Sequence, residues 1–152
     1  MKNLTQLQEL DISGNRLSGK IPAFFESFTE LKKLSISQNN FTDTVPVFLE
    51  DLPALNILEI LNNEFNFDGI EALVNNNSIH KFKYQSQRKI KLHQTSNVLS
   101  VYAGGTLSNN TYKWFKDGVL IATIVGDSTY TPTSNGAYTV QVTNSIATKL
   151  IL

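Results

Sequence analysis

Apolar residues in the first half of the chain recur at one fixed distance. The pattern Leu-x-x-Leu-x-Ile-x-x-Asn-x-apolar starts at Leu7, Leu31 and Leu55, so each copy begins 24 residues after the one before. Alternation of apolar and polar positions inside each copy predicts a short strand with one inward and one solvent-facing side. A degraded fourth copy starts at Ile79 and has Gln87 at the asparagine position. The spacing therefore predicts stacked coils with one strand per turn.

The segments that return from one predicted strand to the next are short. In the first two, a proline precedes an apolar cluster, at residues 23–25 and 47–49. These clusters predict one or two helical turns on the side opposite the strands. The third return segment, residues 67–73, predicts a short helix with Asp68 as its N-cap.

After residue 88 the period ends and short apolar-rich runs separated by turn signals follow. Asp117-Gly118 lies between two such runs and predicts a hairpin. Together the runs predict a compact β-sandwich, with one domain over residues 1–88 and another over 89–152. The predicted strands cover residues 90–93, 98–102, 112–115, 119–123, 128–131, 138–142 and 148–152.

The first 88 residues resemble leucine-rich repeat proteins. The segment Leu17–Pro22 (LSGKIP) is similar to the Leu-x-Gly-x-Ile-Pro ending of plant-type repeats, found in plant receptor ectodomains and some bacterial surface proteins. The second copy has Asp43 in place of the glycine, and the third keeps only Ile70. The ending at residues 84–87 resembles the closing coil of bacterial members. The resemblance implies a short solenoid, a right-handed α/β coil with mostly short parallel strands.

Residues 89–152 resemble an immunoglobulin-like domain of the bacterial surface type. Trp114 stands where the sandwich tryptophan belongs, and residues 135–140 (NGAYTV) are similar to the family's Asp-x-Gly-x-Tyr-x-Cys corner. Tyr138 is then the corner tyrosine, and Val140 replaces the cysteine, so Trp114 is expected to pack against aliphatic residues. The two resemblances imply a piece of a large secreted or surface-attached protein, and hence an extracellular or cell-surface location.

The amino-acid composition excludes several classes of partner and of chemistry. With 13 basic and 13 acidic residues, the balanced charge favours neither nucleic acid nor an anionic membrane as a partner. The absence of cysteine excludes disulfides and thiolate chemistry. No apolar run is long enough for a membrane span, and no apolar signal segment follows Met1, which we interpret as a start residue added to a fragment. No catalytic motif is present, so the sequence predicts a non-enzymatic protein without a cofactor.

Two groups of polar residues are candidates for a structural, metal-binding or catalytic role. The asparagines Asn15, Asn39 and Asn63 form a column, which the repeat pattern assigns to backbone hydrogen bonding inside the coil. Glu9 and Asp11 share one side of a strand, where they could bind Ca²⁺ or act as an acid/base pair. No further carboxylate occupies the equivalent positions of the next coil, so a solvated surface is favoured and no metal site is predicted.

The solvent-facing side of the predicted strands is the candidate binding surface. Its acidic residues lie in the first coil and its basic residues in the last. This surface predicts a recognition or adhesion function toward a protein or a glycan, and the alternative is an architectural spacer without a ligand. The first coil has no capping segment before Leu4, which predicts weak self-association through that edge. The candidate residues are Glu9, Asp11, Ser13, Lys33, Ser35, Ser37, Ile57, Glu59, Leu61, Lys81, Lys83 and Gln85.

Overall fold

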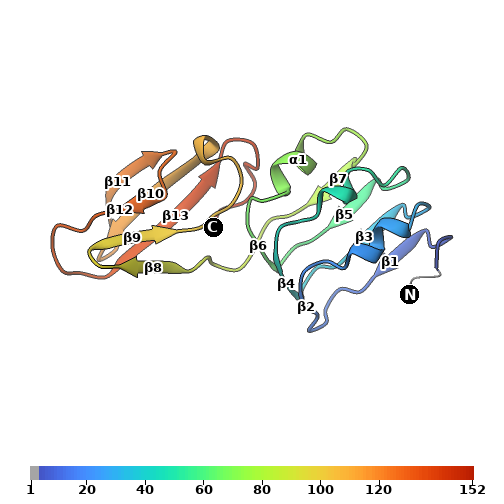
Figure 1. Cartoon of the computed structure of the whole chain (residues 1–152), viewed down its shortest axis with the longest axis horizontal. Coiled ribbons are helices and arrows are strands. Elements are labelled where there is room, and N and C mark those ends of the chain that lie inside the picture. The colour runs from blue at the N-terminus through green and yellow to red at the C-terminus, as the bar shows by residue number, and fades with distance from the viewer. Residues whose placement is uncertain (1–3) are drawn as a thin grey trace.

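A computed structural model describes residues 4–152 and shows the repeats as a parallel sheet (Figure 1). Leu10 pairs with Leu34, and Leu34 pairs with Leu58, so each strand lies one repeat from its neighbour. This register confirms the predicted solenoid with parallel strands. In spatial order, the strands are β1 (Glu9–Asp11), β3 (Lys33–Ser35), β5 (Ile57–Glu59) and β7 (Lys81–Lys83).

A second parallel sheet, which the apolar period does not predict, forms where each coil turns. Gly19 (φ +81°) and Asp43 (φ +67°) lie one 24-residue repeat apart, each at the end of a strand of this sheet, and both have left-handed backbone conformations. That conformation explains the glycine of the repeat ending, and aspartate is among the few other residues that adopt it readily. The strands are β2 (Ser18–Gly19), β4 (Asn40–Asp43) and β6 (Glu64–Phe65).

The return segments form the predicted helical turns. They are η1 (Ala23–Ser27) and η2 (Val47–Leu49), both 3₁₀ turns, and α1 (Ile70–Val74). The prediction that Asp68 caps α1 is wrong. The cap is Gly69 (φ +75°), which makes no side-chain capping bond. The Asp68 carboxylate is engaged elsewhere, because it accepts hydrogen bonds from Tyr102 Oη (2.7 Å) and Gly105 N (2.8 Å).

The second half of the chain forms two antiparallel sheets of three strands each. The hairpin between β10 and β11 turns at Asp117 (φ +50°) and Gly118 (φ +82°), which confirms the predicted turn. A 3₁₀ turn, η3 (Leu107–Asn109), precedes β10. One sheet has the order β11 (Val119–Val125), β10 (Asn110–Lys116), β13 (Tyr138–Asn144), and the other has β12 (Thr129–Tyr130), β9 (Val98–Val101), β8 (Leu92–Thr95).

The predicted strand at residues 148–152 is largely wrong. This segment reaches β13 only at its end, where a single bridge joins Ile151 to Thr143 and Leu152 exchanges backbone hydrogen bonds with Val142. A turn over residues 145–149 occupies most of the predicted run. Ala147 and Leu150 are buried because the chain folds them onto the core here. A strand pattern alone does not distinguish such burial from strand pairing.

The side chain of Trp114 lies between these two sheets. It is fully buried on β10 and stacks on Tyr130 of β12, with 5.4 Å between the ring centroids. Val140 pairs with Trp114 across β10 and β13, which supplies an aliphatic neighbour of the expected kind. The aromatic neighbour Tyr130 was not part of the sequence expectation. Trp114 thus connects one sheet to the other.

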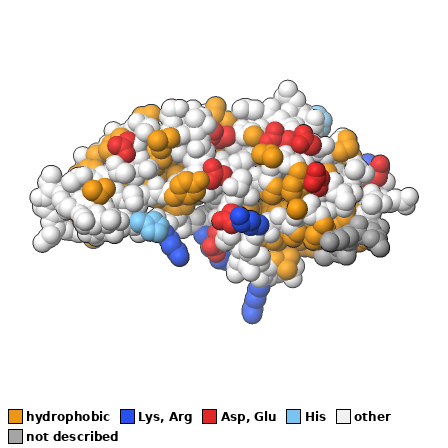
Figure 2. Space-filling model, viewed as in Figure 1, with side chains coloured by type: hydrophobic (Ala, Val, Ile, Leu, Met, Phe, Trp, Pro, Cys, Tyr) orange, Lys and Arg blue, Asp and Glu red, His pale blue; other side chains and the backbone are white. Residues whose placement is uncertain are grey.

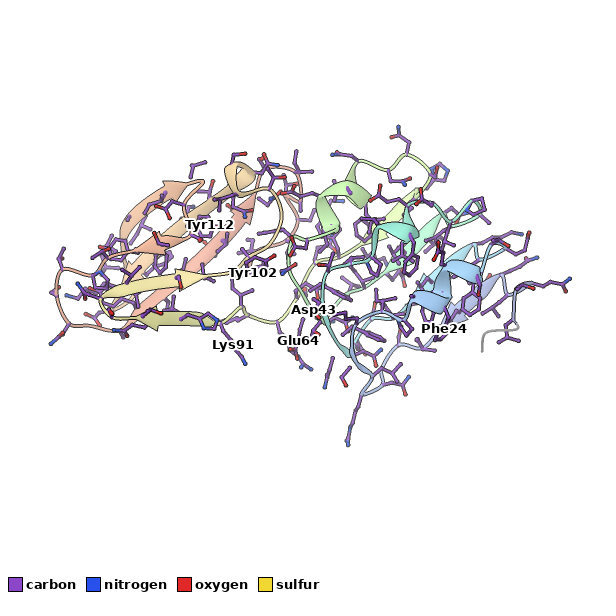
Figure 3. The ribbon with its side chains drawn as sticks, viewed as in Figure 1. Phe24, Asp43, Glu64, Lys91, Tyr102 and Tyr112 are labelled. Carbon is purple, nitrogen blue, oxygen red and sulfur yellow. The ribbon has the colours of Figure 1, made fainter. Side chains whose placement is uncertain are left out.

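Acidic side chains of the third return segment hold the two halves of the chain together. Besides the bonds of Asp68, Glu71 accepts hydrogen bonds from Thr106 N (3.0 Å) and from the side chain of Asn144. Figure 3 labels Tyr102 close to this boundary. Gly105 has φ +69°, and a Cβ there would lie 2.8 Å from Phe67 Cβ, so glycine is favoured at this close approach. Buried residues of both halves belong to one continuous core.

The asparagine column supports the coils from inside. Asn39 Nδ2 donates to Ile12 O (3.0 Å) and Ile36 O (3.1 Å), while Asn39 Oδ1 accepts from Leu17 N (3.0 Å). Each such amide therefore joins its own coil to the preceding one. At the last coil Gln87 takes this place, with Nε2 donating to Ile60 O (2.9 Å). Asn15, in the first coil, has the same local bonds but is exposed.

Replacing Asn39 by alanine is expected to lower the free energy of unfolding by about 1–3 kcal/mol, because buried backbone groups lose their partners. Asn15→Ala is the matched control. Its side chain donates hydrogen bonds to the equivalent local carbonyls but is exposed. Water can replace these bonds in the variant, so the free energy of unfolding should fall by less. Urea unfolding of both variants measures the difference. Equal midpoints for Asn39→Ala and the parent, at an unchanged m-value, would contradict a structural role for the buried amide.

The first strand is an open edge of the repeat sheet. Leu10 and Ile12 are only partly buried, whereas their counterparts Leu34 and Ile36 in the second coil are fully buried. A further apolar side chain of this coil, Leu17, is exposed. The expectation that no cap precedes the first coil, and the interpretation of Met1, concern residues 1–3, which lie outside the described residues.

Candidate functional site

The predicted binding residues lie on one side of the repeat sheet, and we call these twelve side chains the repeat face. Parallel register places Asp11, Ser35 and Glu59 in one row across β1, β3 and β5. Glu9, Asp11 and Lys81 are exposed, and the others, apart from two serines, are half-buried. The structure thus brings these residues onto one surface, formed by strands from every coil.

Ser35 and Ser37 differ from the expected solvent-facing positions. They are only 3% and 8% exposed. Ser35 Oγ lies 2.7 Å from Ser13 Oγ and 3.4 Å from Glu59 Oε2, so side chains of both neighbouring strands close over it. Serine is short and adjacent strands are about 4.8 Å apart, which leaves longer neighbours to cover it. The accessible surface therefore consists of the other members of the repeat face.

Glu59 forms ion pairs with two lysines of the repeat face. Its Oε1 atom lies 2.7 Å from Lys83 Nζ and 3.6 Å from Lys81 Nζ. The hydrogen bond from Lys83 holds the pKa of Glu59 below its ordinary value, although partial burial acts in the opposite direction. Glu59 is consequently ionised at neutral pH and partly neutralises the two lysines of β7.

The opposite end of the face is acidic. Asp11 accepts a hydrogen bond from Ser13 N (2.9 Å), and this bond lowers the pKa of Asp11 below its ordinary value. Within residues 4–152, neither Glu9 nor Asp11 has a basic side chain in salt-bridge contact. The face therefore runs from carboxylates on β1 to lysines on β7, which gives it a dipole along the stack of coils.

The centre of the face carries two apolar side chains. Ile57 precedes and Leu61 follows Glu59, and both are half-buried. Figure 2 shows charged side chains of both signs scattered over the visible side of the molecule, with no large field of one sign. A small apolar centre between an acidic and a basic end can contact a partner by apolar burial and orient it by charge.

Two observations bear on the acid/base and metal-binding roles that the sequence leaves open for Glu9 and Asp11. A lowered pKa makes Asp11 a poor proton donor at neutral pH. Across residues 4–152, no cluster of three or more histidine and carboxylate side chains could hold a metal ion. None of the helices in the same part of the chain has the length and apolar character needed to cross a bilayer.

Sequence reasoning misses Arg88, which spans several coils beside the second parallel sheet. Its guanidinium donates to Asn40 Oδ1 (2.7 Å) and to the carboxylate of Glu64. Glu64 and Asp43 are labelled near each other in Figure 3, on β6 and β4. The only sequence signal is the position of Arg88 directly after Gln87, where the repeat pattern ends.

Comparisons with known proteins find matches among family models and solved structures. No curated protein matches the sequence. One solved structure that matches is the leucine-rich repeat ectodomain of the plant membrane receptor kinase GASSHO1/SCHENGEN3 from Arabidopsis thaliana, in complex with CASPARIAN STRIP INTEGRITY FACTOR 2. The identity is 26% and the TM-score 0.49, over 57% of this chain and 10% of that one. The family model described as "Leucine rich repeat" matches residues 2–66, and the β1–β3–β5–β7 ladder has the corresponding solenoid-like fold.

Proposed function

We propose that this chain is a non-enzymatic recognition module that binds a protein or a glycan through the repeat face. The observation that carries the proposal is the charge distribution of that face, with carboxylates on β1, an apolar centre at Ile57 and Leu61, and lysines on β7. Strand faces of repeat solenoids commonly serve as extended binding surfaces. The dipole favours an elongated partner whose basic end lies over β1 and whose acidic end lies over β7.

We also propose two domains, a leucine-rich repeat domain at residues 1–88 and an immunoglobulin-like β-sandwich at 89–152. Burial of Trp114 between two sheets supports the second assignment. So does Tyr138, whose hydroxyl donates to Ser134 O (2.7 Å), as in the tyrosine corner of such sandwiches. With plant-type repeats of the kind found on receptors and surface proteins, the parent protein would present this module outside the cell, in an adhesive role.

A purely architectural spacer is the second candidate function. The hydrogen bonds of Asp68 and Glu71 across the boundary favour it, because they join the two halves into one stiff unit. A stiff unit keeps its two ends a fixed distance apart, which is what a stalk requires. The two functions differ in whether the repeat face has a ligand.

An array of extracellular proteins and glycans, probed with the intact chain, tests for that ligand. A hit is expected to weaken about tenfold or more in Ile57→Lys, because a charge at a contact centre must be desolvated. Val119→Lys is the matched control, since Val119 is exposed on β11, away from the repeat face. Hits that are insensitive to Ile57→Lys would reject the repeat face as the binding surface. The absence of any hit would favour the spacer.

Self-association through the first coil is a separate prediction. The exposed edge of β1 and the partly buried Leu10 and Ile12 are expected to pair weakly with another copy, giving a concentration-dependent mass. Light scattering over a concentration series measures this mass. Leu17→Lys places a charge at the same edge and should reduce association. A strict monomer at millimolar concentration, with slow amide exchange in residues 7–13, would show that the edge is already protected.

A further inference from the structure

A polar groove crosses the coils where each one turns out of the first parallel sheet. It lies at the connections that follow β1, β3, β5 and β7, three of which lead to the strands of the second parallel sheet (Figure 1). Its volume is about 550 Å³. Most of its lining side chains are amides, and among the lining residues, all within 4–152, none is apolar or acidic.

Two columns of side chains line the groove, because the repeat places equivalent residues 24 positions apart. Directly before the asparagine column lie Gln38, Asn62 and Ser86, and all three are exposed. Their backbones are left-handed, with φ +56°, +54° and +60°. Directly after the asparagine column lie the charged members of the lining, Arg16 and Arg88. The groove therefore presents amide, hydroxyl and guanidinium groups along the stack of coils.

Hydrogen bonds between coils hold the groove in shape. Gln38 N donates to Leu61 O (2.8 Å), and Arg88 N donates to Asn63 O (2.8 Å). The Arg88 guanidinium also donates to Asn40 Oδ1 (2.7 Å), which fixes its position at the edge of the groove. A ligand would thus meet side chains on a backbone that is already ordered, and this lowers the entropy cost of binding.

The chemistry of the lining selects among classes of ligand. Without an apolar side chain, the groove has no pocket for the apolar anchor of a peptide. Two guanidiniums, one of which is paired with Glu64, supply too little charge for a nucleic acid backbone. Amides and hydroxyls exchange hydrogen bonds with hydroxyl groups, and a guanidinium binds a carboxylate through two parallel hydrogen bonds. These groups together match a ligand that is rich in hydroxyls and carries carboxylates.

We propose that this groove binds an acidic glycan chain whose sugar rings lie across successive coils. Sugar hydroxyls would bond to Gln38, Asn62 and Ser86, and uronate carboxylates to Arg16 and Arg88. Neighbouring parallel strands are about 4.8 Å apart, and the rings of an extended sugar chain repeat at a similar distance, so one ring can face each coil. The proposal is independent of ligand binding at the repeat face, which lies on the strands themselves.

The probe is a tetrasaccharide of β-linked mannuronate, titrated into the intact chain by calorimetry at about 0.15 M salt, where charges are screened beyond about 8 Å. A mannose tetrasaccharide of the same linkage has no carboxylate for the guanidiniums and should bind about tenfold or more weakly. A capped tetraglutamate has as many carboxylates but no sugar hydroxyls, and it should also bind about tenfold more weakly. Mannuronate that binds no better than either control, or not at all, would overturn the proposal.

Two variants locate the bound sugar. Asn62→Asp places a negative charge in the groove and should weaken mannuronate binding about tenfold, because like charges repel. Aspartate tolerates a left-handed backbone as asparagine does, so the coil should keep its fold. Asn77→Asp is the matched control, since Asn77 is also exposed but does not line the groove. Equal binding of mannuronate by the two variants would place the sugar elsewhere.

A third variant separates this site from the repeat face. Ile57→Lys adds a positive charge to the repeat face and should leave mannuronate binding within about twofold of the parent, because screening limits the charge to its surroundings. Mannuronate binding that strengthens markedly in Ile57→Lys would assign the sugar to the repeat face and reject the groove. An array ligand that is lost in Ile57→Lys but kept in Asn62→Asp would show the two sites to be distinct.

Discussion

Trp114→Ala is expected to lower the free energy of unfolding by about 3–5 kcal/mol, as large-to-small changes in a packed core do. Trp114 is fully buried between the two sheets, so its removal leaves a cavity and ends the stacking on Tyr130. Fluorescence provides a second measurement, because this is the chain's single tryptophan. The folded emission maximum should be strongly blue-shifted relative to that of the unfolded chain.

A control variant distinguishes the loss of a buried side chain from a general sensitivity of these sheets to substitution. Val119 lies on the neighbouring strand β11 but is 65% exposed, so Val119→Ala should change stability by no more than about 0.5 kcal/mol. Urea unfolding with tryptophan fluorescence and circular dichroism measures the parent and Val119→Ala. Trp114→Ala is followed by circular dichroism alone. A native emission maximum like that of free tryptophan in water would contradict the packing of the two sheets around Trp114.

Gly69→Ala should destabilise the chain by about 2–5 kcal/mol, the sum of a left-handed backbone penalty and overpacking. Gly69 has φ +75°, and a Cβ there would lie 1.8 Å from the carbonyl oxygen of Val45. This carbonyl belongs to the backbone, so it cannot rotate away from the new methyl group as a side-chain atom could. The hydrogen bond from Val45 N to Asp68 O (3.1 Å) also holds these two segments together.

Gly19→Ala tests the two contributions separately. Gly19 has φ +81°, but a Cβ there meets no atom within 4 Å, so only the backbone penalty of about 1–2 kcal/mol applies. Thermal or urea unfolding of both variants gives the difference. If Gly69→Ala and Gly19→Ala lost the same stability, the second coil would have relaxed away from the new methyl group, and the close approach at Val45 would not constrain the fold.

Gly69 also illustrates where local sequence rules fail. An aspartate before an apolar run predicts an N-cap, yet Asp68 bonds instead to Tyr102 and Gly105, residues more than 30 positions away. A capping bond and a bond across the boundary compete for the same carboxylate. The outcome depends on which donors the folded chain brings close, and no local pattern contains that information.

For the candidate surface, too, local rules predict only part of the outcome. Strand alternation places Glu9, Asp11 and Lys81 on the repeat face, and they are exposed there. Alternation also assigns Ser35 and Ser37 to solvent, but both are buried, and Ser13 and Glu59 of the flanking coils contact Ser35. Exposure depends on the lengths of neighbouring side chains in three dimensions, whereas alternation specifies only the side of the sheet.

Elements that repeat or turn locally follow from the amino-acid sequence alone. A 24-residue period specifies parallel register, and Asp117-Gly118 specifies a hairpin, because both depend on residues whose spacing along the chain sets their spacing in space. The stacking of Trp114 on Tyr130 and the bonds of Asp68 across the boundary depend on the tertiary structure. Each of these depends on which surfaces meet after the coils and sheets have formed, and on the geometry that close packing then imposes.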